Sequence, residues 1–297
     1  MKRAVSVGDT CIDYYDNLDR WYPTGNCVDF AVNLSDLGCD TAIVAMAGSD
    51  LYGKSVLELL YKHKVDTSHF CFTGGNTPMT HMTLGGESGR DRIHGSFDEG
   101  VMKNFILTED DLSFISEFEF VHTHKYGRID QWLPEIRKRG CQIVYDFSTS
   151  WCIDVHTDIE RQVDYGVYSC KEDNDALRKY LKEAVMEYGM RAAIATLGDK
   201  GSIACTLSQG VVHGSIVETE AKPEIDQEVI YIYQPAELVP DEKLVNTVGA
   251  GDSYIAGLVS GLLKEYSLER CMAEGAKISA RIVQVFEPYL EPAAIDA

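Results

Sequence analysis

Apolar positions in this chain form short runs that alternate with stretches of helical periodicity. Runs typical of buried strands cover Ala4–Val7, Thr41–Ala47, Phe118–His122, Cys141–Phe147, Tyr165–Ser169 and Ala192–Leu197. Helical periodicity covers Asn26–Leu37, Tyr52–Lys62, Gln131–Lys138 and Asn174–Tyr188. Strand–helix–strand repetition with apolar strands predicts an α/β fold in which helices cover both faces of a mainly parallel sheet.

Two segments, residues 10–25 and 77–98, interrupt this rhythm. They are polar and aromatic, contain turn residues and lack helical periodicity. Such segments predict short β stretches, which fit either a small sheet that projects as a lid over a cleft or ordinary surface hairpins. Because the chain shows no internal repeat or linker, we expect a single domain over residues 1–297, with these segments inserted in it.

The clearest helical face lies near the C-terminal end and follows a run of small residues. After Asp252, apolar residues recur at helical spacing: Ile255, Leu258, Val259, Leu262, Leu263 and Tyr266. Gly249, Ala250 and Gly251 stand at the start of this predicted helix, where unpaired backbone N–H groups carry partial positive charge. The turn is a candidate anion site, with Asp252 beside it as a candidate proton acceptor. A glycine-rich helix cap with a favourably placed aspartate is the alternative.

Composition narrows the possible partners. The chain has 297 residues and a formal net charge of -20, which disfavours nucleic acid and anionic membrane surfaces. Its nine cysteines form no CxxC pair, a pattern typical of reduced thiols rather than of a disulfide framework or zinc site. No apolar run approaches the ~18 residues of a membrane span, and no signal peptide is visible, so we expect a cytoplasmic protein.

Residues 48–55 match the P-loop pattern GxxxxGKS literally and lie between a predicted strand and a predicted helix. Physical detail weakens this interpretation. Asp50 would place a carboxylate in the phosphate cradle, and Leu51 and Tyr52 are bulky where such a loop must wrap closely.

Two further groups of polar residues are candidates for binding. His122 and His124 lie on one face of a predicted strand; we expect pocket histidines rather than a metal pair, since no further ligand stands at an obvious spacing. In the second predicted lid segment, Arg90, Asp91, Arg92 and His94 cluster. They fit either a polar substrate or a solvated hairpin.

The string NTVGAGDSYIAGL, residues 246–258, resembles the C-terminal signature of the PfkB/ribokinase family of carbohydrate kinases. GNCVDFAVNLSDLGCDTAIVAMAGSDLYGK is similar to the family's N-terminal signature, and TLGDKGS, residues 196–202, to its nucleotide-site segment. The resemblance covers essentially the whole chain and implies a ribokinase-like three-layer α/β/α fold with a small β-sheet lid. It also implies transfer of phosphate from ATP, with Mg²⁺, to a primary hydroxyl group of a sugar or sugar derivative.

The resemblance implies roles for individual residues. Asp252 matches the catalytic base, and Gly249, Ala250 and Gly251 match the anion hole for the moving phosphoryl group. The candidates for the sugar pocket are Asp9, Asp13, Gly25, Asn26 and, from the lid, Arg92. The candidates for the nucleotide site are Thr196, Gly198, Gly201, Asn246 and Thr247. The family's metal-associated segment has no clean match, and Glu172 and Asp173 are the candidates to organise Mg²⁺ through water.

Two departures from the family pattern bear on substrate and cofactor. Thr24 precedes Gly25-Asn26 where paired glycines are usual, so we expect a narrower sugar site. Asn246 stands where aspartate is usual. Because that aspartate helps to hold a monovalent cation in several relatives, the loss of its charge argues against potassium activation.

Within the family, the resemblance is strongest to members that phosphorylate fructosamines, on VGDTCIDYYDNL, DEGVMKNFILTEDDL, VYDFS and TVGAGDSYIAG. It implies a fructosamine such as fructoselysine as the acceptor, phosphorylated at O-6, and a homodimer formed through the lid. Fructokinase or another PfkB-type sugar kinase is the nearest alternative. A non-catalytic sugar or nucleotide sensor on the same fold is more remote, and the intact Gly-Ala-Gly-Asp string argues against it.

Overall fold

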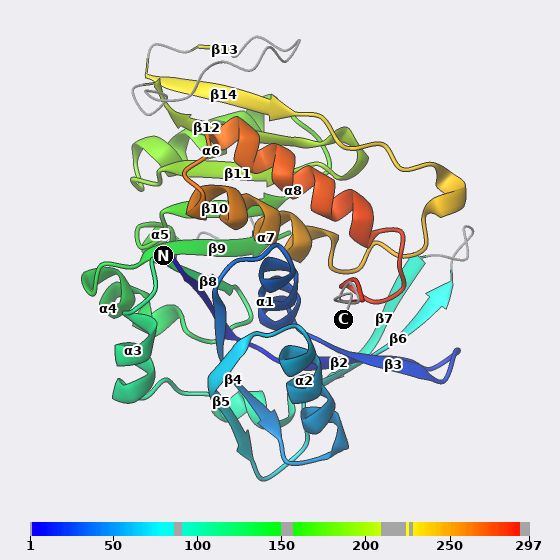
Figure 1. Cartoon of the computed structure of the whole chain (residues 1–297). Coiled ribbons are helices and arrows are strands. Elements are labelled where there is room, and N and C mark those ends of the chain that lie inside the picture. Colours follow the sequence, from blue (N-terminus) through cyan, green and yellow to red (C-terminus); the bar gives the residue numbers. More distant parts are fainter. Residues whose placement is uncertain (1, 86–90, 150–156, 209–223, 226–227, 292–297) are drawn as a thin grey trace.

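The computed structural model describes residues 2–85, 91–149, 157–208, 224–225 and 228–291. Its centre is a ten-stranded sheet with helices on both faces (Figure 1). In spatial order the strands are β13 (Glu224–Ile225), β14 (Val229–Gln234), β12 (Ser202–Leu207), β11 (Ala192–Thr196), β10 (Tyr165–Ser169), β9 (Gln142–Ser148), β8 (Phe120–His124), β1 (Ala4–Gly8), β4 (Thr41–Gly48) and β5 (Asp66–Thr73). From β11 to β5 all neighbours are parallel, and only the β12, β14 and β13 pairings are antiparallel. The predicted α/β fold with a mainly parallel sheet is confirmed.

Alternation along the strands supplies an apolar layer to each face of the sheet. Val5 and Ile143 face one layer, whereas their neighbours Ala4 and Val144 face the other. The first layer is covered by α3 (Glu109–Ile115), α4 (Leu133–Lys138), α5 (Thr157–Glu160) and α6 (Asp175–Met186). The opposite face is covered by α1 (Asn26–Asp36), α2 (Leu51–Lys62), α7 (Ala250–Leu263) and α8 (Leu268–Ile282). Short 3₁₀ turns are η1 (Gly100–Asn104), η2 (Asp130–Trp132), η4 (Gly198–Lys200) and η6 (Asp241–Lys243).

The predicted strands and helices all form, with ends shifted by a few residues. One prediction is wrong at its end: α7 stops at Leu263, so Tyr266 packs against the core from the following turn rather than from the helix. Of the elements that no apolar pattern had indicated, β5, β12, α3 and α8 are the largest. Part of β5 is exposed, which explains why it lacks a continuous apolar run.

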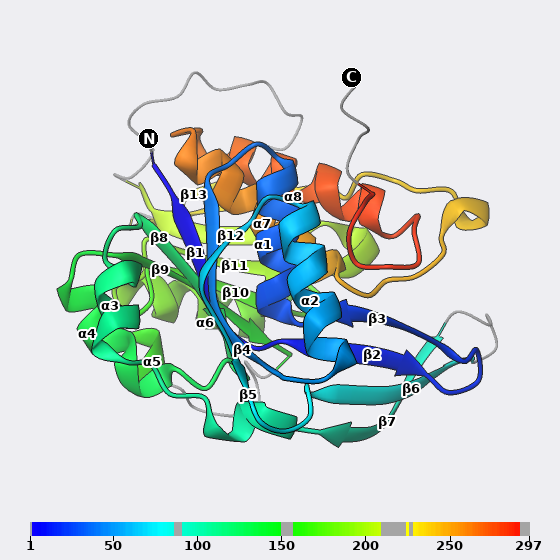
Figure 2. The same cartoon turned by 60° about the horizontal axis from the view of Figure 1, so that its bottom comes forward.

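The two segments that interrupt the rhythm form one small sheet. It contains β3 (Arg20–Thr24), β2 (Cys11–Tyr15), β6 (Met79–Gly85) and β7 (Asp91–Asp98), in that order. Parallel pairing of β2 with β6 joins the two segments, so the small-sheet alternative is correct and separate hairpins are excluded. Figure 2 shows this sheet projecting from the main body beside α2.

Strand β1 lies at the point where the chain order of the large sheet reverses. It pairs with β4 on one side and with β8 on the other. Ligands of open α/β sheets bind outside the carboxyl ends of the strands at such a point. The fold therefore places a candidate pocket where β1 and β8 end, under the small sheet. None of the described helices is both long and apolar enough to cross a membrane.

Candidate active site

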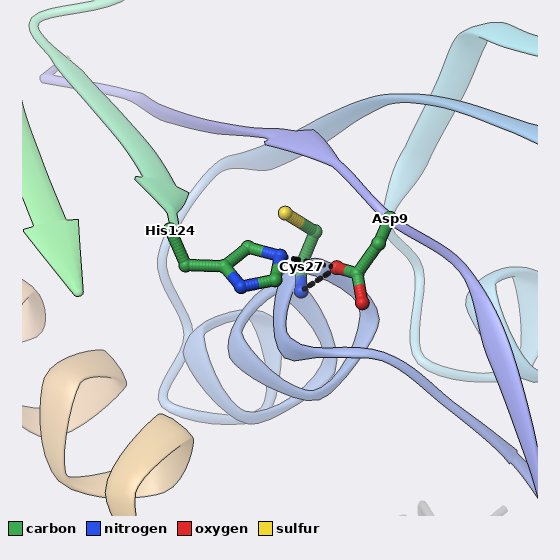
Figure 3. Close-up of side chains that lie close together, drawn as sticks. All are labelled: Asp9, Cys27 and His124. Atoms are coloured by element: carbon green, nitrogen blue, oxygen red, sulfur yellow. Dashed lines mark hydrogen bonds and ion pairs between the residues drawn. The ribbon is translucent and has the colours of Figure 1, made fainter. Parts of the chain in front are cut away.

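Polar side chains from distant parts of the chain meet at the ends of β1 and β8. The Asp9 carboxylate accepts a hydrogen bond from His124 Nε2 through Oδ1 at 2.8 Å, and from the Cys27 backbone N–H at 3.1 Å. Figure 3 shows these three side chains converging from β8, from α1 and from the segment after β1. The sequence predicted a pocket position for His124 but gave no sign of its partner.

Asp9 and His124 form a partly buried ion pair. Burial alone would raise the pKa of Asp9, but the charge of His124 and its hydrogen bond lower this pKa from 3.8 to about 2. Burial alone would lower the pKa of His124, but the charge of Asp9 and its hydrogen bond hold it well above its usual 6.5. His122, two residues earlier, differs: burial and the charge of His124 lower its pKa, and its Nδ1 lies 2.9 Å from Ser6 Oγ.

Asn26 and Asp146 form a second contact in this pocket. Asn26 begins α1, and its Nδ2 donates to Asp146 Oδ2 at 3.4 Å. The other oxygen of Asp146 accepts the Ser148 N–H at 2.7 Å. Burial raises the pKa of Asp146, although the Ser148 bond and the charge of His124 oppose this shift. Gly25, the residue before α1, has φ 122°, and a Cβ there would lie only 3.2 Å from Asp9 Oδ2.

The candidate anion turn stands at the start of α7. Gly249 precedes the helix with φ 72°, a left-handed conformation that favours glycine, and no side chain of the described residues caps the helix there. Asn246 fixes the approach to the turn: its Oδ1 accepts the Val248 N–H at 3.1 Å, and its Nδ2 donates to the Phe286 carbonyl at 2.9 Å. No side chain in the described part of the chain accepts from the N–H groups of Ala250 and Gly251, so these donors can meet an anion.

Asp252 lies in the first turn of α7, and its charge acts on Asp29 of α1. Asp29 is only 2% exposed. Burial, followed by the charge of Asp252, raises the pKa of Asp29 well above 3.8, although the Thr24 hydroxyl donates to Asp29 Oδ2 at 2.7 Å. Among the described residues, Asp29 Oδ1 has no hydrogen-bond partner. Thr24, the departure from the paired glycines, thus directs its hydroxyl to this buried carboxyl.

Asp29→Asn is expected to stabilise the protein at alkaline pH. A carboxyl whose pKa is higher in the folded state binds more protons when folded, so its contribution to stability falls as pH rises above about 4. We expect the variant to gain on the order of 1–3 kcal/mol in unfolding free energy at pH 8 and much less at pH 4. Urea unfolding at both pH values measures this difference. An equal loss of stability at both would contradict it.

The nucleotide-site candidates lie along the edge next to α7. Thr196 ends β11, and Gly198 and Gly201 follow it with φ 63° and 91° in the turn to β12. The first residue of β12, Ser202, bonds the Tyr254 hydroxyl of α7 at 2.8 Å. This bond ties the turn to the helix that carries Asp252. Thr247 lies just before α7, where its carbonyl accepts the Ala250 N–H at 3.4 Å.

The remaining site candidates differ in their burial and in their partners. Asp13 of β2 is buried, at 3% exposure. Arg92 belongs to β7, but its side chain, like Arg90, lies outside the described part of the chain. Both Glu172 and Asp173 are exposed, and the Asp173 carboxylate forms a bidentate ion pair with Arg178, at 2.9 and 2.8 Å.

Residues 48–55, which match the P-loop pattern, form a helix cap rather than a phosphate-binding loop. The Asp50 carboxylate caps α2 by accepting the Gly53 N–H at 2.8 Å, and it also accepts the backbone N–H and hydroxyl of Thr77, at 2.8 and 2.7 Å. A carboxylate that occupies these donors leaves no cradle for phosphate.

The sequence missed Asp29, Cys27 and Asp146 as neighbours of the candidate site residues. Asp29 and Cys27 look like ordinary positions of an amphipathic helix, and Asp146 ends a buried strand run. The only available signal for Asp146 was its position at the carboxyl end of a parallel strand. Donor atoms of Asp9, Cys27 and His124 lie within 4.8 Å of one another, a set that could also hold a metal ion. The direct 2.8 Å contact of His124 with Asp9 accounts for this cluster as an ion pair.

A three-layer α/β/α fold, a small second sheet and a glycine-rich helix start at the pocket define a sugar kinase of the ribokinase kind. The chain belongs to the pfkB family of carbohydrate kinases, whose family model matches residues 1–136 and 166–293. It is therefore an ATP-dependent carbohydrate kinase, with a sugar and ATP as its substrates, and kinases of this family typically use Mg²⁺.

Comparison with individual proteins shows which carbohydrate kinases the chain resembles. The chain is 29% identical to fructoselysine 6-kinase of Shigella flexneri, over 96% of this chain and 98% of that one. It is 27% identical to fructosamine kinase FrlD of Bacillus subtilis strain 168, over 96% of this chain and 92% of that one. The fold is similar to that of Arabidopsis thaliana ribokinase complexed with ribose and ATP, with a TM-score of 0.75, 18% identity and coverage of 96% and 94%.

Proposed function

We propose that the enzyme transfers the γ-phosphoryl group of ATP to O-6 of a fructosamine such as fructoselysine. The observation that carries this proposal is the similarity to fructoselysine 6-kinases over nearly the whole chain. The charge of the pocket supports it. Asp9, Asp13 and Asp252 all act on the pKa of Asp29, and His124 is the cation that faces Asp9. An excess of carboxylates suits an acceptor with a protonated amine.

In the proposed mechanism, Asp252 orients the acceptor hydroxyl and takes its proton as the phosphoryl group arrives. An ordinary aspartate is too weak a base to form an alkoxide outright, but a loose transition state lets the proton move late. The backbone N–H groups of Gly249, Ala250 and Gly251 stabilise the charge on the transferring group. Such preorganised donors are typically worth ~10²–10³ in rate each.

Substrate binding is assigned to the residues that flank this centre. Asp9, Asp13, Gly25 and Asn26 hold the sugar; Thr196, Gly198, Gly201, Asn246 and Thr247 surround the nucleotide. Because Arg178 occupies Asp173, Glu172 is the better candidate to position Mg²⁺ through water. The metal ion, when bound, neutralises phosphate charge. We include Arg92 as a lid contact to the acceptor.

The small sheet is proposed to act as a lid and as the contact between two subunits. Its outer strands are β3 and β7, and β7 exposes Ile93 and Phe97, at 51% and 60%. Exposed apolar side chains on an edge strand favour pairing with a second copy. None of the eight described cysteines is in a disulfide, which fits the proposed location in the cytoplasm.

A panel of acceptors tests the proposed substrate. We expect kcat/KM for fructoselysine to exceed that for fructose by at least ~100-fold, because a neutral sugar forfeits the attraction of the carboxylates. ADP release measures turnover, and phosphorus NMR of the product identifies O-6 as the site. Equal or better turnover of fructose would favour the fructokinase alternative, and no turnover of any acceptor would favour the sensor.

A further inference from the structure

We propose that His124 is a positioning residue for the acceptor sugar: it holds Asp9 through Oδ1 and thereby presents Asp9 Oδ2 to a hydroxyl group of the substrate. This inference rests on the proposed function in one respect, namely that Asp9 binds the acceptor.

The two oxygens of the Asp9 carboxylate have different surroundings. Oδ1 is saturated, because it accepts both His124 Nε2 at 2.8 Å and the Cys27 N–H at 3.1 Å. Oδ2 lies beside Gly25, where a Cβ would approach it to 3.2 Å. The Asp9 side chain is 18% exposed, whereas that of His124 is 2% exposed. Of the two groups, the Asp9 carboxylate is therefore the one that solvent or a substrate can reach.

The environment of His124 fixes its ring. Nδ1 lies 3.4 Å from the Tyr126 backbone N–H, and Nε2 points at Asp9. The Cys27 thiol completes the cluster as a third, fully buried neighbour. Nε2 carries a proton both in the charged ring and in one of the two neutral tautomers. In both forms it donates to Asp9, so the orientation of the carboxylate does not depend on the charge of the ring. A carboxylate fixed in this way loses less conformational entropy when it binds a hydroxyl group of the substrate.

Substitutions at His124 separate its role from general support of the fold. His124→Leu removes the donor, and His124→Gln retains an N–H group near the position of Nε2. We expect the KM for the acceptor to rise roughly 10- to 100-fold in the first and less in the second, with the KM for ATP nearly unchanged. His63→Gln is the matched control, since His63 is also a buried histidine beside a carboxylate, with Nδ1 2.8 Å from Asp36 Oδ1, but does not contact Asp9. It is expected to leave the acceptor KM near the wild-type value.

A double variant tests whether His124 acts through Asp9. If it does, Asp9→Asn combined with His124→Leu raises the acceptor KM no more than Asp9→Asn alone. Effects that multiply would overturn the inference, as would an unchanged acceptor KM in both His124 variants. Should the leucine variants fail to fold, Asp9→Asn with His124→Gln serves in the same comparison.

Two further outcomes are distinguishable. If Asp9→Asn itself leaves the acceptor KM unchanged, the proposed sugar pocket fails, and the inference about His124 fails with it. If acceptor turnover lost on chelation is restored by Mg²⁺ together with Zn²⁺ but not by Mg²⁺ alone, the cluster of Asp9, Cys27 and His124 holds a metal ion instead. This result would overturn the positioning role while leaving the kinase assignment intact.

Discussion

Asp252→Asn is expected to lower kcat by roughly 10³-fold, within the 10²–10⁴ typical of a lost general base. The amide has the same shape as the carboxylate but cannot accept the proton of the acceptor hydroxyl. KM for ATP and for the acceptor should change only a few-fold, because neither substrate depends on that proton for binding. The variant also removes a charge that acts on the buried Asp29, so its thermal stability should be equal to or above that of the wild type. Steady-state kinetics and calorimetric unfolding measure both effects.

Lys54→Ala is the control that separates this account from the P-loop reading. Lys54 is exposed on α2, whose start is capped by Asp50. Its loss should leave kcat near the wild-type value. A large loss of kcat in Lys54→Ala together with an active Asp252→Asn would mean that phosphate binds at residues 48–55 rather than at α7.

The second large effect is expected from adding a side chain at Gly251. A Cβ built at this position meets nothing within 4 Å beyond its chain neighbours and the backbone of its own helix, so Gly251→Val should fold with nearly unchanged stability. If the phosphoryl group approaches the first N–H groups of α7, however, the valine occupies its space. We expect kcat/KM for ATP to fall by roughly 10²–10³-fold, the magnitude of losing one or more preorganised donors.

Gly74→Val provides the matched control. Gly74 also has open space around its Cβ position and is exposed, but it lies in the loop after β5, far along the sheet from α7. The control should retain activity. Full activity in Gly251→Val would show that this helix start does not approach the phosphate. By contrast, Gly249 is unsuited to the test, because a Cβ there would come within 2.3 Å of Pro288 and disturb the fold itself.

The sequence predicted those features that depend on local pattern. Apolar runs predicted the buried strands, because a strand that is covered on both faces is apolar along its whole length. Helical periodicity after a run of small residues predicted the start of α7. The two segments of the small sheet, residues 10–25 and 77–98, were recognisable because their apolar residues lack helical spacing. Their joining into one sheet follows from the pairing of β2 with β6, which a local pattern does not encode.

The rest of the site depends on contacts between residues far apart in the chain. His124 and Asp9 are 115 positions apart, and Asn26 and Asp146 are 120 positions apart. No periodicity reports which strand ends become neighbours, so the ion pair could not be read from residue types alone. Asp29 was hidden for another reason: on a helix it resembles any solvated aspartate, and only tertiary packing around α1, including its contact with α7, buries it.

The central claim is that the N–H groups at the start of α7 receive the moving phosphoryl group while Asp252 receives the proton. A crystal structure with ADP, a fluoride mimic of the transferring phosphoryl group and fructoselysine tests it most directly. We predict that the mimic lies about 3 Å from the backbone nitrogens of residues 249–251, with Asp252 at similar distance from O-6 of the acceptor. A mimic bound at residues 48–55, or a carboxylate of Asp252 that contacts no acceptor atom, would contradict the account.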